Sequence, residues 1–247
     1  MHQIIYGIHT IEEIIRFNPI KIKQLYIKKG KLNKRLISII NKLKNLDIKI
    51  QFANKKWMDS STNNAVHQGI IAYINKNKEY QISDIDQIIK KKQNPFLLIL
   101  NKIVDPYNLG ACLRSANAAN VDIVFITKKK SAPLNETVRK TSSGSIDYLK
   151  IIKVTNTINL IKLLKKKNIT IIGTDSAQKN KNIYSSNFKK PLALIVGSEN
   201  LGISKEIKKN CDTIIKIPIL GNIQSLNVSV TTGIFLFEII RQRLFTK

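Results

Sequence analysis

The sequence predicts an α/β protein with a mainly parallel sheet, preceded by a smaller α/β domain. From residue 95 onward, short and almost continuous apolar runs alternate with helical patterns, and such runs suit strands buried on both faces of a sheet. The first 75 residues also alternate between strand and helix patterns, but the polar, lysine-rich segment 76–94 separates them from the rest. We therefore expect two domains, at 1–75 and 95–247, joined by a linker at 76–94.

The elements of the smaller domain are predicted from local periodicity. Thr10 and Glu13 have the spacing of a capping box, which predicts the start of a helix with an apolar face of isoleucines. The remaining elements are expected in the order strand, helix, strand, strand, at 22–27, 32–43, 48–52 and 69–74.

Six apolar runs in the larger domain are predicted to be strands. They are PFLLIL (95–100), VDIVFIT (121–127), LKIIKV (149–154), ITIIGT (169–174), PLALIVG (191–197) and DTIIKIPI (212–219). After the first run, Leu109, Cys112, Leu113 and Ala116 have helical spacing, which is the pattern of a strand followed by a helix that crosses back over the sheet. A long amphipathic helix is expected from about residue 226 to 245.

The balance of charge favours a polyanionic partner. The chain carries 42 basic and 16 acidic residues, a net charge of +26, which exceeds what solubility requires. Both parts contribute, because residues 1–94 hold 18 basic and 7 acidic residues and residues 95–247 hold 24 and 9. Codon bias is the alternative source of this charge, since the chain is also rich in isoleucine and asparagine.

Several kinds of chemistry are excluded by residue types that are missing. Cys112 and Cys211 are the only cysteines and lie in no CxxC or Cys/His pattern, so we expect a reducing compartment and no metal site. The histidines, at positions 2, 9 and 67, all precede the larger domain, which therefore has no imidazole base of its own. No phosphate-loop motif and no GxGxxG motif occurs. The sequence has no signal-type start and no apolar run of about 20 residues, which predicts a cytoplasmic protein without a membrane segment.

The first candidate site segment is DPYNLGACLRSA, residues 105–116, at the end of a predicted strand. Ligands of parallel sheets bind at such strand ends. Asn108 is placed as a helix cap or a ligand contact, Gly110 permits a close backbone approach, and Arg114 follows Asn108 by about one and a half helical turns. Taken alone, the segment favours a purely structural interpretation, with the asparagine as a helix cap and the arginine as a solvated charge.

Two further segments have the same character. IVGSENLGI, residues 195–203, places Glu199 between two glycines at a strand exit. IPILGNIQSLNVSVTTG, residues 217–233, runs through a glycine turn to Ser225 and Asn227 at the start of the last helix, where free backbone N–H groups can receive a polar ligand. Each of these segments alone is also consistent with an ordinary turn or cap.

In this order and at these separations, the three segments resemble the SpoU-type RNA ribose methyltransferases. The shared motifs read DPxNLGAxLRSA, GSExxG after a strand, and IPxxGxxxSLNVSV. YGIHTIEEII near Tyr6 and VHQGIIAYI at 66–74 resemble the family members that methylate a guanosine in the P-loop of 23S ribosomal RNA. The resemblance implies methylation of a ribose 2′-hydroxyl with S-adenosylmethionine as the methyl donor.

The resemblance also implies an architecture and a set of site residues. It implies a C-terminal trefoil knot, a homodimer with active sites at its interface, and a ribosomal-protein-like RNA-binding module at 1–75. By the motifs, the cofactor would be contacted at Gly197, Ile217, Leu226 and the loop at Gly221. The catalytic and RNA-facing residues would be Asn108, Arg114, Glu199, Ser225 and Asn227.

The role of the arginine follows from its chemistry. A guanidinium is almost never deprotonated in a protein, so we expect Arg114 to hold a phosphate and stabilise developing alkoxide charge, with the base left open. One departure from the guanosine-specific pattern lies at 139–147, where Asp147 stands in place of a glutamate. If that acid contacts the substrate, its shorter side chain alters the positioning.

Two other functions remain open. One is a transfer-RNA ribose methyltransferase with the same catalytic motifs, although the extra N-terminal domain favours ribosomal RNA. The other is a non-catalytic RNA-binding protein of the same fold, which the joint presence of the site residues disfavours. The expected partner is 23S ribosomal RNA, either free or in a large-subunit assembly intermediate.

Overall fold

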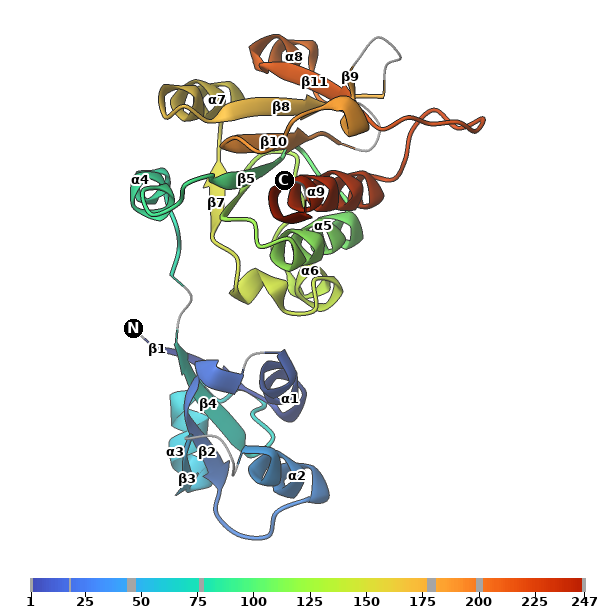
Figure 1. The fold of residues 1–247 in the computed structure, drawn as a ribbon. Coiled ribbons are helices and arrows are strands. Elements are labelled where there is room, and N and C mark those ends of the chain that lie inside the picture. Colours follow the sequence, from blue (N-terminus) through green and yellow to red (C-terminus); the bar gives the residue numbers. More distant parts are fainter. Residues whose placement is uncertain are drawn as a thin grey trace. The chain divides into compact units, whose positions relative to one another are not determined.

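The computed structural model describes residues 2–17, 19–43, 48–75, 78–176, 181–198 and 202–245. The chain divides into two compact units, Met1–Lys78 and Glu79–Lys247 (Figure 1). Each unit has its own sheet and its own hydrophobic core.

The first unit is a four-stranded mixed sheet with helices on both faces. Its strands are β1 (His2–Tyr6), β2 (Ile22–Lys28), β3 (Lys49–Ala53) and β4 (Ile70–Asn75), in the order β1-β4-β2-β3. β2 and β3 are parallel, and β4 is antiparallel to both of its neighbours. Its helices are α1 (Ile8–Phe17), α2 (Lys34–Leu43), α3 (Lys55–Ser61) and a 3-10 turn at Pro19–Lys21. Residues of α1 and α2 form the core on one face, and α3 lies on the other (Figure 1).

The predicted elements of this unit are confirmed, but the predicted start of the first helix is wrong. The strands expected at 22–27, 48–52 and 69–74 and the helix across 32–43 are present. However, α1 begins at Ile8, so Thr10 lies inside the helix rather than at its cap. The Gln68 Oε1 atom accepts a hydrogen bond from the Ile8 N–H at 2.9 Å, and this cap comes from 60 residues away. β1 and α3 had no predicted counterpart.

The second unit is a seven-stranded sheet in which every pair of strands is parallel. Its strands are β5 (Phe96–Leu100), β6 (Ile123–Thr127), β7 (Ile151–Val154), β8 (Thr170–Thr174), β9 (Lys181–Asn182), β10 (Leu192–Val196) and β11 (Thr213–Lys216). Their order is β7-β6-β5-β10-β8-β11-β9. All six apolar runs predicted as strands are therefore confirmed, and the mainly parallel sheet is confirmed with them.

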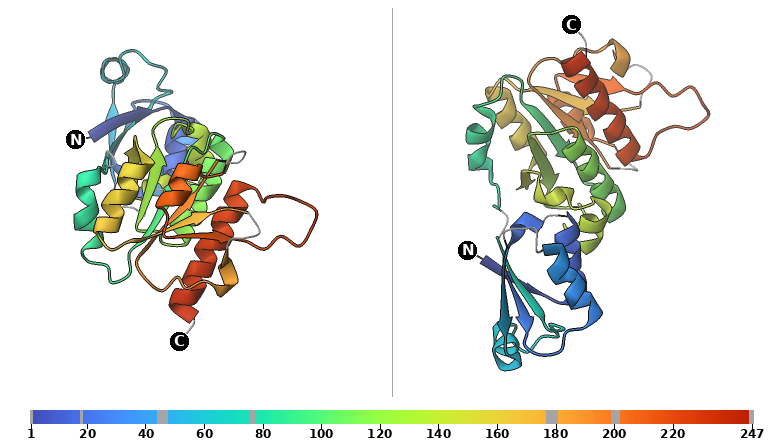
Figure 2. Two further views of the ribbon diagram at one scale, coloured as in Figure 1. Left: turned by 90° about the horizontal axis from the view of Figure 1, so that it is seen from above. Right: turned by 60° about the horizontal axis from the view of Figure 1, so that its bottom comes forward.

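Helices cover both faces of this sheet. They are α4 (Ile85–Ile89), α5 (Pro106–Ala118), α6 (Glu136–Thr141), α7 (Thr157–Lys166), α8 (Lys205–Asn210) and α9 (Val228–Phe245), with 3-10 turns at Ile82–Asp84, Ser145–Asp147 and Ile183–Ser185. α5, α6 and α9 lie on one face, and α4, α7 and α8 on the other (Figures 1 and 2). None of the helices in the described residues has the length and hydropathy needed to cross a membrane.

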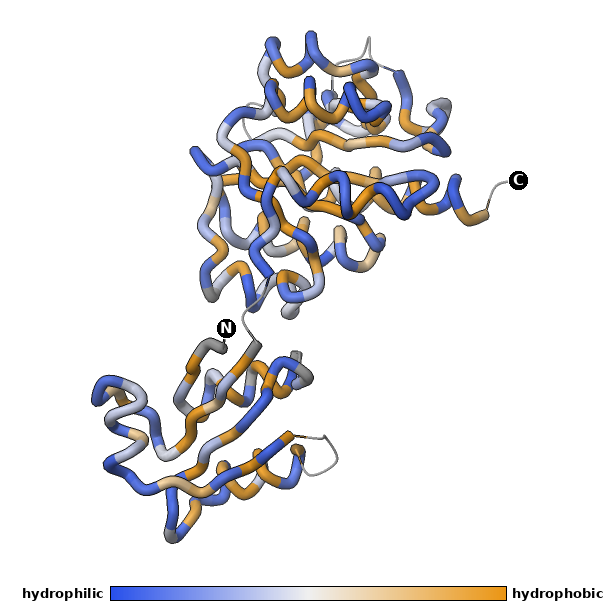
Figure 3. Tube along the Cα trace, turned by 90° about the vertical axis from the view of Figure 1, so that its left-hand side faces the viewer, coloured by the Kyte–Doolittle hydropathy of each residue, from blue (hydrophilic) through white to orange (hydrophobic). Residues whose placement is uncertain are grey.

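The two-sided burial explains why the strand sequences are continuously apolar. Along β5, Leu98 and Leu100 point into the core beneath α5 and α9, whereas Leu97 and Ile99 point into the core beneath α7. Neither face of β5 is left to solvent, so neither set of its positions is polar. Figure 3 shows the resulting concentration of hydrophobic residues along the strands of this unit.

The segment that the sequence predicted as a linker packs against the second unit from residue 79 onward. Ile85 is fully buried in the core of that unit, and Tyr80 forms a parallel bridge with Ile152 of β7. Lys92 forms an ion pair with Asp122 at 2.8 Å. Ile85, Ile88 and Ile89 give α4 an apolar face within a polar stretch, and this face packs against the core of the second unit.

Gly110 of α5 permits close packing of two helices rather than approach to a ligand. A Cβ atom at this position would lie 2.6 Å from Thr141 Cβ and 3.0 Å from the Val138 carbonyl oxygen of α6. We expect Gly110→Ala to lower the free energy of unfolding by about 1–3 kcal/mol, because overpacking forces neighbouring groups to move. Denaturant titration measures this change.

The matched control is Gly233→Ala in α9, where the nearest atom to an added Cβ is Ser115 Oγ at 3.9 Å. This helical position has room, so alanine should raise stability by about 0.5–1 kcal/mol. Equal effects of the two substitutions would contradict the packing role of Gly110.

Candidate active site

The described part of the second unit contains a cavity of about 300 Å³ at the carboxyl ends of β8, β10 and β11, next to the start of α9. Its apolar wall is formed by Val196, Ile215, Ile217, Leu226 and Phe235. In parallel α/β sheets, the carboxyl ends of the strands are where ligands bind. The cavity therefore lies where the sequence predicted a ligand site.

Polar groups gather on the side of the cavity formed by the end of β8. Thr174, Asp175 and Ser176 line it in succession. The Asp175 carboxylate accepts a hydrogen bond from the Lys208 ammonium at 2.6 Å, which holds the acid in place. The cavity thus combines an apolar wall with a carboxylate and hydroxyls, and this combination suits a ligand with an apolar body and a charged end.

These β8 residues were missed by sequence reasoning. The signal was present, because Asp175 and Ser176 directly follow the apolar run predicted as a strand at 169–174. Polar residues at a strand exit are candidates for a site by the same rule that selected the three motif segments.

Gly197 allows the loop after β10 to close on itself. A Cβ atom there would lie 2.1 Å from the Gly202 carbonyl carbon and 2.4 Å from the Ile203 nitrogen. Gly202 adopts a left-handed φ of 59°, and its N–H donates to the Ser198 carbonyl at 2.9 Å. Gly197, Ser198 and Gly202 all line the cavity. The predicted site residue Glu199 lies outside the described residues.

The connection from β11 to α9 extends away from the body of the unit (Figure 2). Ile217, Ser225 and Leu226 line the cavity. Gly221 belongs to the exposed part of the loop, where an added Cβ would meet no atom within 4 Å. The structure therefore brings the two ends of this segment to the cavity, while Gly221 is not among its lining residues.

Asn108 and Asn227 connect the first and third motif segments. The Asn227 Nδ2 atom donates to Asn108 Oδ1 at 3.0 Å, across 119 residues of sequence. Asn227 Oδ1 also accepts from the Ser229 N–H at 2.8 Å, at the first turn of α9. The cap of α5 is Asp105, which accepts from the Tyr107 and Asn108 N–H groups. The interpretation of Asn108 as the helix cap is therefore wrong, and its side chain is used for the link between the segments.

Arg114 lies on the exposed surface of α5, six residues beyond Asn108. Its guanidinium stays charged at any physiological pH and presents several N–H donors in one plane. An exposed arginine of this kind can receive an anion that arrives from solvent.

Asp147, the residue that departs from the expected pattern, is tied to Arg139. The Arg139 Nη1 atom donates to both carboxylate oxygens, at 2.8 and 2.9 Å, and the Asp147 side chain is only 4% exposed. The acid therefore joins α6 to the following 3-10 turn instead of reaching into solvent.

The fold and site together define a class of protein. A parallel α/β unit has a ligand cavity at its strand ends with polar side chains around it, and a separate small basic α/β unit precedes it. This arrangement suits a protein that binds a small molecule in its cavity and a large polyanion on its surface. The chain belongs to the SpoU rRNA Methylase family, whose model matches residues 95–237. Residues 4–80 match the model described as RNA 2′-O ribose methyltransferase substrate binding.

Individual relatives are similar over almost the entire chain. The chain is 41% identical over 243 residues to a Photorhabdus laumondii protein named 23S rRNA (guanosine-2′-O-)-methyltransferase RlmB, covering 98% of this chain and 99% of that one. An Escherichia coli protein of the same name is also 41% identical over 243 residues, covering 98% of this chain and 100% of that one.

Solved structures agree with the fold. The SpoU methyltransferase AviRb from Streptomyces viridochromogenes, in complex with the cofactor AdoMet, superposes with a TM-score of 0.68 at 19% identity. The match covers 100% of this chain and 92% of that chain. At this identity the similarity supports the α/β fold, and the function is argued from the site and the sequence relatives.

Proposed function

We propose that this chain transfers a methyl group from S-adenosylmethionine to the ribose 2′-hydroxyl of a guanosine in the P-loop of 23S ribosomal RNA. The observation that carries the proposal is the 41% identity that runs through both units to relatives named 23S rRNA (guanosine-2′-O-)-methyltransferase. A relative that shared only the catalytic unit would support the chemistry without supporting the target.

The cavity at the strand ends fits S-adenosylmethionine. Its apolar wall suits an adenine ring and the methylene groups of the methionine chain, and Asp175 and the neighbouring hydroxyls suit the charged amino acid end. We assign Gly197, Ile217 and Leu226 to the cofactor, since all three line the cavity. When bound, the cofactor supplies a methyl group that its sulfonium has already activated for transfer.

The residues around the cavity have to position a poor nucleophile. A ribose hydroxyl is a weak acid, so its oxygen must be held in line with the methyl group and the loss of its proton must be favoured. We assign the linked Asn108 and Asn227 to orient the ribose, together with Ser225 at the cavity and Glu199 on the neighbouring loop. Arg114 would hold the adjacent phosphate and stabilise negative charge as the proton leaves.

The finer architecture is part of the same proposal. The family resemblance supports a trefoil knot around the cofactor loops and a homodimer. Exposed apolar side chains on α5 and α9 favour the dimer, because Tyr107, Val230 and Phe237 are 65%, 49% and 52% exposed. Such side chains on adjacent helices of one unit suit burial against a second copy.

The first unit would recognise the RNA. It matches the substrate-binding family model and, with the segment up to residue 94, carries 18 basic and 7 acidic residues. We propose that it is a ribosomal-protein-like module for 23S RNA or a large-subunit assembly intermediate, and that the protein acts in the cytoplasm, where ribosomes are assembled.

The test is to incubate the purified protein with labelled S-adenosylmethionine and unmethylated 23S transcript, and then to map alkali-resistant positions. A single 2′-O-methyl group on the P-loop guanosine is the expected result. Methylation of transfer RNA alone would contradict the proposed target but would agree with the proposed reaction. If neither transcript nor a purified assembly intermediate is methylated while the cofactor binds, the chain is an RNA-binding protein without this activity.

A further inference from the structure

Two loops at the carboxyl ends of β5 and β6 gather four exposed lysines. The loop 101–105 carries Lys102, and the loop 128–132 carries the run Lys128, Lys129 and Lys130. β5 and β6 are neighbouring parallel strands, so the two loops leave the same edge of the sheet side by side. The first loop leads directly into α5, which bears Asn108 and Arg114.

Hydrogen bonds hold the two loops together. The Lys102 N–H donates to Thr127 Oγ1 at 2.8 Å, and Thr127 Oγ1 shares a hydrogen bond with Ser131 Oγ at 2.7 Å. The Ala132 N–H donates to the Ile103 carbonyl at 2.8 Å. The four lysines therefore lie on two loops whose backbones are joined by hydrogen bonds, and we call this pair of loops the lysine platform. Because these loops are already ordered, they lose less conformational entropy when a ligand binds.

Two of these lysines have a backbone conformation that lysine rarely adopts. Lys102 and Lys130 have φ values of 59° and 57°. Eight non-glycine residues among those described have a positive φ, and four of these are asparagines, which tolerate this region better. Glycine would be the less strained residue at both lysine positions. Backbone strain of this kind is found at functional sites, so these two lysines are candidates for a role in binding.

The charge of this platform is not balanced within the described residues. None of the four lysines forms an ion pair with a residue that the structure describes. The loops contain one acid, Asp105, whose carboxylate is bound to N–H groups at the start of α5. Other lysines of the unit are paired, as in Lys92 with Asp122, Lys165 with Asp212 and Lys208 with Asp175.

We propose that Lys102, Lys128, Lys129 and Lys130 bind the phosphates of the RNA strand next to the target nucleotide. The inference rests on the proposed function for the identity of the polyanion. The cofactor cavity lies at the ends of β10, β8 and β11, on the other side of β5 from β6. With Asn108 between the two regions, the target ribose enters the cavity while its strand continues over the lysine platform.

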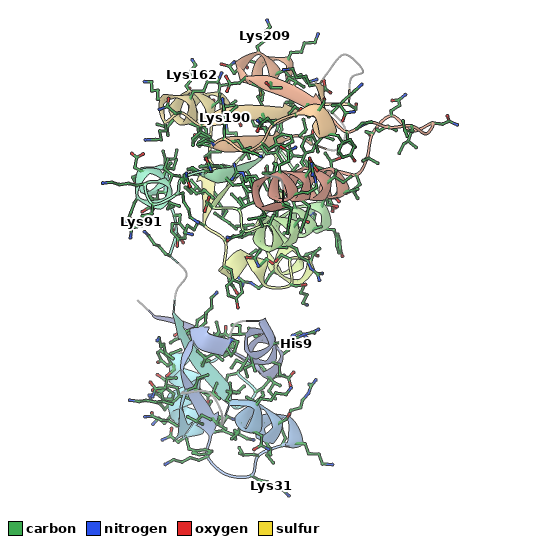
Figure 4. The ribbon with its side chains drawn as sticks, in the orientation of Figure 1. His9, Lys31, Lys91, Lys162, Lys190 and Lys209 are labelled. Carbon is green, nitrogen blue, oxygen red and sulfur yellow. The ribbon has the colours of Figure 1, made fainter. Side chains whose placement is uncertain are left out.

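The test compares two triple variants of the whole protein. Lys128→Ala, Lys129→Ala and Lys130→Ala together remove three charges from the platform. The control removes three exposed lysines from α7 and α8, by Lys162→Ala, Lys166→Ala and Lys209→Ala; Lys162 and Lys209 are labelled in Figure 4. The dissociation constant for a P-loop fragment of 23S RNA is measured against salt concentration, with S-adenosylmethionine affinity measured in parallel.

We expect the platform variant to bind the RNA about 10- to 100-fold more weakly near 0.1 M salt, with a salt slope about 2 to 3 units flatter. The control should bind nearly as the unchanged protein does, and both should keep their cofactor affinity. Equal weakening in both variants, or none in the platform variant, would overturn the inference. If the unchanged protein binds the RNA normally but does not methylate it, the proposed function is contradicted. The comparison of RNA affinity between the two variants still tests the role of the lysines.

A single substitution, Lys102→Gly, distinguishes a role of Lys102 in RNA binding from a role in the stability of the loop. Lys102→Gly removes the charge and relieves the left-handed backbone, so we expect a higher midpoint of thermal unfolding together with weaker RNA binding. A lower midpoint, or unchanged RNA affinity, would show that Lys102 serves the structure of the loop instead.

Discussion

Arg114→Ala is expected to slow methyl transfer by about 100- to 1,000-fold while leaving S-adenosylmethionine affinity almost unchanged. The arginine lies on the exposed surface of α5, outside the set of residues that line the cofactor cavity. In the proposed mechanism, its loss removes the charge assigned to hold the phosphate and to stabilise the developing alkoxide. Single-turnover kinetics with saturating cofactor, together with a cofactor titration, measure the two quantities separately.

Arg114→Lys is the matched variant, because it keeps the charge and removes the planar pair of donors. An intermediate loss of rate is expected if the guanidinium binds a phosphate with more than one N–H group. Loss of cofactor affinity with a normal rate at saturating cofactor would show that the arginine belongs to the cofactor side.

The fold of the larger unit was predictable because its central strands, β5, β6 and β10, are buried on both faces. Apolar runs this short favour strands over buried helices, and all six became parallel strands. The predictions that failed depend on distant contacts. The cap of α1 comes from Gln68, and the segment containing Ile85 is ordered by the core beneath it. A rule based on the spacing of neighbouring residues cannot predict contacts with Gln68 or with the core, because both come from distant parts of the sequence.

The sequence motifs named several residues that line the cavity, but they gave no information on how the fold brings them together. Gly197, Ile217, Ser225 and Leu226 came from two separate motifs, and the fold gathers them around one cavity. The bond between Asn108 and Asn227 spans 119 residues, so nothing in either segment could indicate it. Asp175 was missed because it lies outside the motifs that carry the resemblance.

Gly197→Ala is expected to raise the dissociation constant for S-adenosylmethionine by about 10- to 100-fold, because relieving the overlap would cost about 1–3 kcal/mol. The added methyl group would lie 2.1 Å from the Gly202 carbonyl carbon and 2.2 Å from its oxygen. Both atoms belong to the backbone, so no side chain can rotate away. The loop that lines the cavity has to move, and calorimetric titration with the cofactor measures the consequence.

Gly221→Ala provides the comparison, since an added methyl group there meets no atom within 4 Å. Both substitutions place the same group on a glycine in a loop that follows a strand of the same sheet, so a far smaller change at Gly221 would assign the effect at Gly197 to the clash with Gly202. Equal losses would mean that both loops respond to any added bulk. Unchanged affinity in Gly197→Ala would show that the loop opens at little cost, and the close contact with Gly202 would then not be what shapes the cofactor site.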